Sequence, residues 1–233
     1  MSNSYYQLST GRVAAIGGDC AFPSLNKALS EPNGLIAIGG DLSAIRLLSA
    51  YKQGIFPWYN AGEPIMWWSP NPRMVLFPDE LKISSSLNKM LKKNLFEVRL
   101  NTAFRQVISA CSLSTRGKQA EARQSNTWIS DEMINAYCEL HNLGYAISAE
   151  SWLNNKLVGG CYGIKIGHMF YGESMFYTQT DASKVAFMHL VNQLKNEGVG
   201  MIDCQMKTPL LASFGGREIE REEFMQNLLK LIE

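Results

Sequence analysis

Apolar and polar residues follow two different patterns along this chain. In its first third, Gly, Pro and aromatic residues recur every few positions, which is typical of short strands and one or two short helices joined by turns. Asp41 or Ser43 can cap a helix that runs through Tyr51, and Gly54 stands just past its expected end. Beyond this part, longer periodic segments predict a different organisation.

Two prolines, Pro70 and Pro72, mark the change between the patterns. Each proline favours extended backbone at the residue before it, so no helix is expected to cross this stretch. We therefore predict two domains, a small N-terminal domain over residues 1–72 and a larger domain over residues 73–233.

The larger part carries the signals of several helices. Ser130 is a good helix cap, while Gly144 and Gly198 are good terminators. The polar run at residues 112–126 is expected to form an exposed loop. One helix is indicated by apolar residues at helical spacing, Phe187, Leu190, Val191 and Leu194. The other helices are expected at residues 85–93, 102–111, 131–143 and 222–232.

Strand-like runs lie between these helices, at residues 146–152, 157–166, 169–176 and 199–205. Gly167 and His168 fit the tight turn of a hairpin between the second and third runs. Hairpins followed by a strand–helix–strand unit indicate an α+β protein, in which helices pack on a mixed sheet.

Composition narrows the class of protein. An apolar share of 46% with only 18% charged residues in 233 describes an ordinary globular chain, and a net charge of +1 gives no global attraction to nucleic acid. The five cysteines show no spacing for a metal or a disulfide framework, so a reducing cytoplasm is expected. The N-terminal residues lack the pattern of a signal peptide, and no apolar run is long enough to span a membrane.

A polar pair stands on the run at residues 199–205. Strand alternation places Asp203 and Gln205 on one face, and Ile202 and Cys204 on the other. Buried polar groups need partners, so the pair either satisfies itself and nearby backbone or forms part of a site.

A carboxylate, Glu173, stands in an apolar stretch where it is out of place. Gly172 beside it would let a ligand or another backbone approach closely. A glutamate at a strand end that faces water is the alternative.

Aromatic residues and basic residues each form a further group. Nucleic-acid bases stack on aromatic rings, although burial at a domain seam explains any single ring equally well. The aromatic candidates are Tyr51, Trp58, Trp67, Trp68 and Trp128, and adjacent Trp67 and Trp68 must point to opposite faces of a strand. The basic cluster, a candidate phosphate-facing surface or simply a solvated face, consists of Lys82, Lys89, Lys92, Lys93, Arg99, Arg105, Arg116, Lys118 and Arg123.

Taken together, these segments resemble the leucyl/phenylalanyl-tRNA–protein transferases. The resemblance runs from about residue 21 to about residue 220, in the order of the family's motifs, and departs from it in a longer 112–126 loop and a short C-terminal tail. The matching stretches are Ala21-Phe22-Pro23, Glu31-Pro32-Asn33-Gly34-Leu35, Gly39-Gly40-Asp41-Leu42, Gly54-Ile55-Phe56-Pro57-Trp58, Trp67-Trp68-Ser69-Pro70-Asn71-Pro72-Arg73, Thr127-Trp128-Ile129, Gly172-Glu173-Ser174-Met175-Phe176 and Ile202-Asp203-Cys204-Gln205.

The resemblance implies a small N-terminal domain joined to an acetyltransferase-like (GNAT) domain. It also implies a cytoplasmic enzyme that moves Leu or Phe, and less readily Met, from aminoacyl-tRNA to proteins that begin with Arg or Lys, which are then degraded through the N-degron route. No cofactor or metal is expected, and we expect a monomer.

Site residues follow from the same resemblance. Gln205 would sit beside the reacting amine with Asp203 in support, and Glu173 and Asp203 would supply negative charge for a basic acceptor. The aminoacyl pocket would be formed by Phe170, Met175, Ile202, Cys161 and Leu190. Adenosine would stack among Tyr51, Trp58, Trp67, Trp68 and Trp128, while Arg73 and the basic cluster would hold phosphates. One tension remains, because alternation places Ile202 opposite Asp203, so both reach one cavity only if the strand bends.

Two other functions compete with this one. A CoA-dependent N-acetyltransferase would need a glycine-rich phosphate loop before the helix near Asp181, but residues 178–184 contain no glycine. A non-catalytic RNA-binding module would explain the aromatic residues but would leave Glu173, Asp203 and Gln205 without a role.

Overall fold

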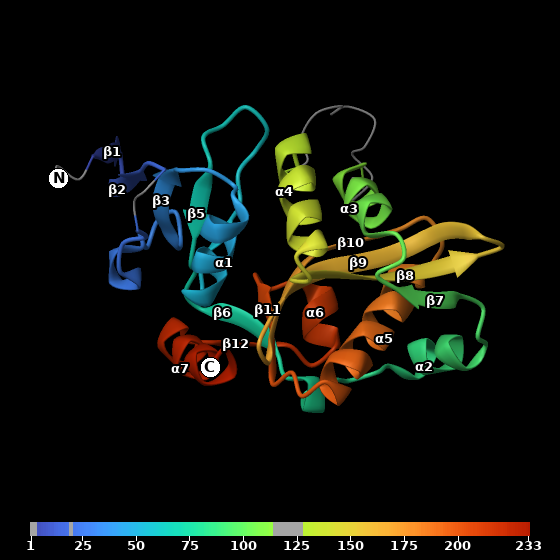
Figure 1. The fold of residues 1–233 in the computed structure, drawn as a ribbon. Helices are drawn as coiled ribbons and strands as arrows, with labels where there is room; N and C mark the ends of the chain where they lie inside the picture. The colour runs from blue at the N-terminus through green and yellow to red at the C-terminus, as the bar shows by residue number, and fades with distance from the viewer. Residues whose placement is uncertain (1–3, 19–20, 114–127) are drawn as a thin grey trace.

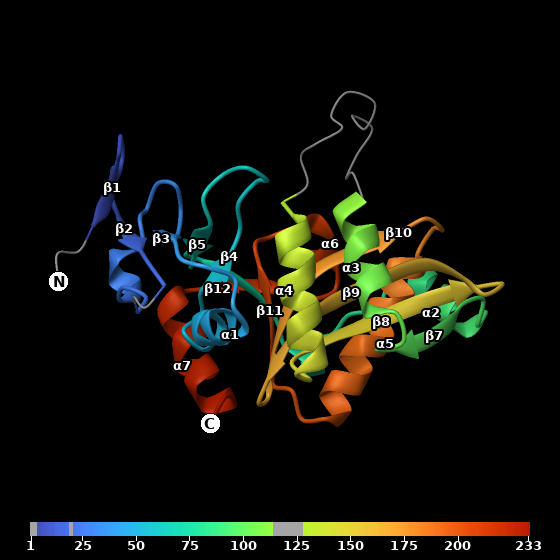
Figure 2. The same cartoon turned by 45° about the horizontal axis from the view of Figure 1, so that its top comes forward.

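Two β-sheets organise the chain (Figures 1 and 2). The computed structural model describes residues 4–18, 21–113 and 128–233. The smaller sheet has the strand order β1-β2-β3-β5-β4. Its strands are β1 (Tyr5–Leu8), β2 (Gly11–Ile16), β3 (Leu35–Gly39), β4 (Phe56–Pro57) and β5 (Met66–Trp68). Helix α1 (Ala44–Lys52) and the 3₁₀ turn η1 (Leu25–Lys27) belong to the same part of the chain.

The larger sheet has the order β12-β6-β11-β10-β9-β8-β7. Strands β10 and β11 pair in parallel and the other neighbours pair antiparallel, which confirms a mixed sheet. Its strands are β6 (Arg73–Leu76), β7 (Glu97–Leu100), β8 (Ala146–Leu153), β9 (Lys156–Ile166), β10 (Met169–Tyr177), β11 (Met201–Gln205) and β12 (Arg217–Ile219).

Helices cover both faces of the larger sheet. In Figures 1 and 2, α3 and α4 lie on one side of β8, β9 and β10, and α5 lies on the opposite side with α2 beside it. The helices of this part are α2 (Ser85–Lys92), α3 (Phe104–Leu113), α4 (Asp131–Asn142), α5 (Ala182–Asn196), α6 (Pro209–Ser213) and α7 (Arg221–Leu231), with the 3₁₀ turn η2 (Pro78–Glu80). The predicted α+β class is therefore confirmed.

Local signals account for most of these elements. The Ser43 hydroxyl accepts from Arg46 N at the start of α1, and the Ser130 hydroxyl accepts from Met133 N at the start of α4. Gly167 has a φ of 57° in the turn between β9 and β10, a conformation that glycine adopts at little cost. The predicted 112–126 loop lies outside the described residues except for its first two positions, which complete α3.

One hydrophobic core joins the two sheets. It brings Trp67 of β5 together with Tyr137 of α4 and with Phe224 of α7. Figures 1 and 2 show α7 beside α1, and a Cβ placed at Gly54 would meet the Phe224 ring at 2.9 Å. The first sheet ends before Pro70 and the second begins after Pro72, but because this core is continuous, the division at residue 72 stays a prediction.

Candidate active site

A fork opens between the parallel strands β10 and β11. The two strands pair only from Met169 to Tyr171 on β10 and from Met201 to Asp203 on β11. Beyond that point β10 continues to Tyr177 against β9 alone. The side chains that follow the last paired residues therefore face an open space.

The end of β11 is turned away from β10 by its own hydrogen bonds. Gln205 has a φ of +62°, its N–H donates to Asp203 Oδ1 at 2.9 Å, and Met206 N donates to Cys204 O at 2.7 Å. Backbone groups that bond locally cannot extend the parallel ladder, so these contacts hold the fork open.

An irregular register on β11 changes which side chains reach this space. The pairing with β6 shifts between Asp203 and Gln205, as in a β-bulge. As a result Ile202, Cys204 and Gln205 all line the cavity in the fork, whereas Asp203 does not. The expectation that Asp203 and Gln205 share one face is therefore wrong. The tension over Ile202 disappears because Asp203 lies on the opposite face, outside the cavity.

The cavity has a volume of about 1270 Å³. All the residues predicted for an aminoacyl pocket line it, namely Phe170, Met175, Ile202, Cys161 and Leu190. Phe187 and Cys204 add to the same apolar wall and were not predicted as pocket residues. Glu173 and Gln205 supply polar groups beside this wall, so the cavity combines an apolar slot with a few polar atoms, as substrate pockets commonly do.

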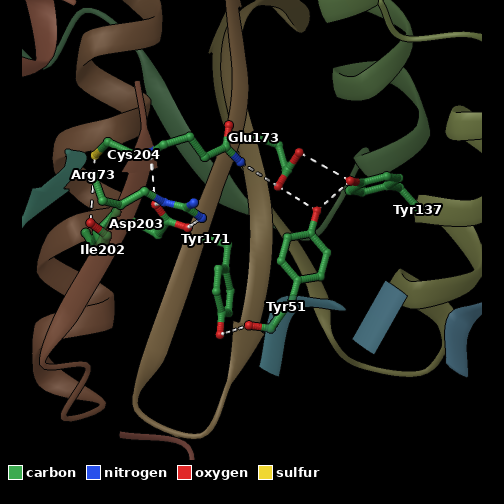
Figure 3. Close-up of polar contacts among 9 residues, drawn as sticks. Tyr51, Arg73, Tyr137, Tyr171, Glu173, Ile202, Asp203 and Cys204 are labelled. Atoms are coloured by element: carbon green, nitrogen blue, oxygen red, sulfur yellow. Dashed lines mark hydrogen bonds and ion pairs between the residues drawn. The ribbon is translucent and has the colours of Figure 1, made fainter. Parts of the chain in front are cut away.

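Glu173 is held by three donors at the closed end of the fork (Figure 3). Tyr51 Oη donates to Glu173 Oε1 at 2.7 Å, Gln205 Nε2 to the same oxygen at 3.2 Å, and Tyr137 Oη to Oε2 at 3.3 Å. The two phenol oxygens lie 2.5 Å apart. Since the amide nitrogen of Gln205 points to Glu173, its amide oxygen is left to accept a hydrogen bond from a ligand.

Burial raises the pKa of Glu173 to about 7, and the charge of Asp203 adds to the increase, while the hydrogen bonds from Tyr51, Tyr137 and Gln205 oppose it. The carboxyl group is thus poised to change its charge near neutral pH. Burial also raises the pKa of Tyr51 and of Tyr137 well above the usual range, so both phenols remain donors.

The role of Tyr137 was missed by sequence reasoning. On α4 it is spaced by four residues from Met133 and by three from Leu140, and all three side chains are buried. This spacing is what a core position shows, and only the fold reveals that its hydroxyl reaches Glu173.

Asp203 forms a buried ion pair instead of lining the cavity. Arg73 Nε donates to Asp203 Oδ1 at 2.8 Å and Arg73 Nη2 to Oδ2 at 2.6 Å, with Arg73 1% and Asp203 0% exposed. The guanidinium also lies 4.7 Å from the ring centres of both Phe56 and Phe224. The expectation that Arg73 holds tRNA phosphates does not fit this burial, and Asp203 has no free charge to offer an acceptor.

The predicted aromatic group divides into buried and accessible rings. Tyr51 and Trp67 are fully buried, and Trp67 Nε1 donates to Gly39 O, so neither ring presents a face to a base. Trp58 and Trp128 line the cavity. Trp68 is half-buried, contacts Trp58 edge to face and donates from Nε1 to Trp58 O. The ring faces available for stacking thus belong to Trp58 and Trp128.

The basic cluster is separate from the cavity. None of its described members lines the cavity, and Arg116, Lys118 and Arg123 lie outside the described residues. Arg99 pairs with Glu97 and lies over the Trp152 ring. Its expected contact with phosphates stays a prediction.

The start of α5 offers no phosphate loop. Asp181 stands at the N-cap, and its carboxylate pairs with Lys184 at 2.7 Å. An acidic side chain at a helix N-terminus opposes an anionic pyrophosphate, which argues against the CoA-dependent alternative.

Comparisons with known proteins show the family of the chain. Residues 75–229 match the family described as "Leucyl/phenylalanyl-tRNA protein transferase", and residues 40–71 match its N-terminal domain. The chain belongs to the leucyl/phenylalanyl-tRNA–protein transferase family. Proteins with that name are 55% identical in Nitrosomonas europaea, over 94% of this chain and 90% of the relative, and 54% identical in Chromobacterium violaceum, over 91% and 89%. Membership confirms the expected enzyme class, an aminoacyltransferase.

The fold also has a distant counterpart among solved structures. The crystal structure of FemX matches 96% of this chain and 85% of its own with a TM-score of 0.51 at 8% identity, a likeness of fold alone. The mixed, helix-flanked sheet is that of the acetyltransferase-like fold that the resemblance implies. None of the helices in the described part of the chain is long and apolar enough to cross a membrane.

Proposed function

We propose that this enzyme transfers Leu or Phe, and less readily Met, from aminoacyl-tRNA to the α-amine of proteins whose N-terminal residue is Arg or Lys, which directs them to N-degron degradation. The observation that carries the proposal is the position of Glu173 and Gln205, hydrogen-bonded to each other, beside an apolar slot in the fork. A carboxylate, an amide and a slot of this kind suit an amine acceptor and an apolar acyl group.

The donor side chain fits the apolar wall of the cavity. Phe170 and Ile202 are paired neighbours on β10 and β11, and Met175 lies further along β10. The thioether of Met175 adapts its shape easily, which favours acceptance of Leu, Phe and Met in one slot. Trp58 and Trp128 lie on the same cavity and would stack the terminal adenosine of the tRNA.

The acceptor's positive charge requires a carboxylate. Among the described residues, Glu173 and Asp181 both line the cavity, but the carboxylate of Asp181 is already paired with Lys184. Asp203 is already paired with Arg73, so its negative charge is compensated within the protein. A cation next to Glu173 would lower the pKa of that carboxyl from about 7 and favour its charged form. We therefore assign recognition of the basic acceptor to Glu173. Asp203 has the role of positioning Gln205.

Chemistry at the ester needs positioning more than a strong base. An α-amine has a pKa of about 7.7–8.0, so a useful fraction is neutral at neutral pH. The amide oxygen of Gln205 accepts a hydrogen bond from this amine. This contact aims the lone pair of the amine nitrogen at the ester carbonyl, which is a proximity effect. The new C–N bond forms, the ester C–O bond breaks, and the proton of the amine ends on the ribose oxygen that leaves as a hydroxyl.

A transfer assay tests the proposal. Radiolabelled Leu-tRNA and a peptide that begins with Arg should give labelled peptide, and the same peptide with an acetylated α-amine should give none. Labelled acetyl-CoA serves as a control donor. Acetylation of the peptide would favour the CoA-dependent enzyme, and RNA binding without any transfer would favour the non-catalytic module.

A further inference from the structure

The fork leaves one edge of β10 without a strand partner. Thr178 N donates to Val158 O at 2.8 Å, at the end of the pairing between β9 and β10. Hydrogen bonding alternates along an antiparallel pair, so Phe176 and Thr178 bond to β9. Met175 and Tyr177 therefore turn their backbone N–H and C=O groups away from β9 and toward the fork.

These backbone groups are open to a ligand. Within the described part of the chain, no hydrogen bond is made by the N–H or C=O of Met175 or Tyr177 on this side. Both residues line the cavity, and Tyr177 is exposed at its mouth. An edge with unpaired N–H and C=O groups is a template for an added strand.

The cavity is also large enough for two reactants. Its volume of about 1270 Å³ exceeds the roughly 300–1,000 Å³ of a typical small-molecule site. The opposite wall cannot fill the gap, because Gln205 N and Met206 N are already bonded within β11 and the turn that follows it. Room for an extended chain thus remains beside an aminoacyl group.

We infer that the first residues of the acceptor protein bind as a short strand on the free edge of β10, parallel to it, in the space from which β11 turns away. This inference rests on the proposed function. The acceptor's α-amine must lie near Glu173 and Gln205, at the closed end of the fork. The chain behind it must leave through the mouth beside Tyr177, so it runs in the direction of β10.

Strand geometry then sets which acceptor groups are used. In a parallel ladder, one residue bonds to the two residues that flank its partner, so a single acceptor residue donates its N–H to Met175 C=O and accepts from Tyr177 N–H. Met175 is two positions beyond Glu173, about 6.6 Å along a strand. The bridging residue is therefore the second or third of the acceptor. Such main-chain bonds do not depend on side chains, which suits an enzyme whose acceptors share only their first residue.

Acceptor peptides test this arrangement directly. The set consists of a five-residue peptide that begins with Arg and continues with Ala, and four versions that are each N-methylated at position 2, 3, 4 or 5. We expect N-methylation at position 2 or position 3 to raise the acceptor KM by about 5- to 10-fold, the loss of one hydrogen bond. Methylation at position 5 should leave KM unchanged and serves as the matched control.

A second arm changes the enzyme. Tyr177→Pro removes the unpaired N–H, and proline is tolerated where an edge N–H faces outward. Tyr177→Ala removes the same ring and keeps the N–H. The acceptor KM should rise by about 3- to 10-fold in the proline variant relative to the alanine variant, with the KM for Leu-tRNA equal in both.

The outcomes distinguish a failure of this inference from a failure of the proposed function. If the unmethylated peptide receives no Leu, the proposed function fails. If it receives Leu and every methylated peptide reacts with the same KM, the strand addition is overturned while the transfer stands. Should the proline variant fail to fold, the peptide series decides alone.

Discussion

Arg73 and Asp203 form a two-pronged ion pair that is sealed from solvent and ties β6 to the strand that carries Gln205. Asp203 Oδ1 accepts from Arg73 Nε and from Gln205 N, so the same oxygen links the pair to the turn that points Gln205 into the cavity. Asp203 thus acts through Gln205 and does not itself reach the substrate.

Replacing Arg73 should damage both stability and transfer. Arg73→Met leaves Asp203 charged and unpaired, and loss of one partner of a buried pair costs about 3–5 kcal/mol of unfolding free energy. Arg99→Met breaks the exposed pair with Glu97 and should cost below about 1 kcal/mol. Denaturant unfolding measures both. Arg73→Lys keeps the charge but loses the fork of donors, so we expect a folded enzyme with lower kcat and an unchanged donor KM; wild-type kcat would contradict the link to Gln205.

More of the fold than of the site could be predicted from the sequence. Ser43 and Ser130 predict the starts of their helices, because a cap acts on the residues next to it. Glu173 can be recognised as a candidate because it is a carboxylate in an apolar run. The face of Gln205 could not be predicted, because strict alternation ignores the bulge between Asp203 and Gln205. The burial of Arg73 depends on α7, which lies about 150 residues away in sequence and packs against it through Phe224. Contacts of this range leave no local signal.

Transfer should depend on pH through Glu173. Since burial raises the pKa of Glu173 to about 7, the carboxylate forms as pH rises through neutrality, and kcat/KM for an Arg-starting peptide should rise over the same range. Glu173→Gln should lower kcat/KM by at least about 10-fold and remove this ionisation from the profile. The ionisation of the acceptor amine remains and is the internal reference. A variant profile that keeps the inflection near pH 7 would show that another group titrates there.

Stability should show the opposite pH dependence for the same group. A carboxyl whose pKa is raised from 4.5 to about 7 on folding favours the folded state below pH 4.5, and this contribution is lost as pH rises through 7. Glu173→Gln removes the ionisable group, and with it this loss of stability at higher pH. The unfolding free energy of the variant minus that of the wild type should therefore be larger above pH 7 than at pH 4.5. Parallel stability curves for the two proteins across this range would contradict the assignment.

The two phenols at Glu173 should tune its charge unequally. Both donate to the carboxylate, which favours the charged form, so removal of either hydroxyl should raise the pKa of Glu173 further. Tyr51→Phe should shift the inflection of kcat/KM upward more than Tyr137→Phe, because its bond is 2.7 Å against 3.3 Å. Tyr162→Phe, a nearby buried phenol that makes no hydrogen bond to Glu173 in the described structure, is the matched control. A downward shift would mean that the phenols do not stabilise the carboxylate.

The ring of Trp128 should bind the donor and not the acceptor. Trp128 lines the cavity and, with Trp58, offers a ring face that a base can reach, whereas Trp67 is buried in the core. Loss of one stacked base costs about 1–3 kcal/mol, so Trp128→Ala should raise the KM for Leu-tRNA by about 5- to 150-fold and leave the acceptor KM unchanged. Trp152→Ala removes a ring outside the cavity, beneath Arg99, and should leave both values near wild type. An unchanged donor KM in Trp128→Ala would show that this ring serves the fold, and the adenosine would then have to rest on Trp58.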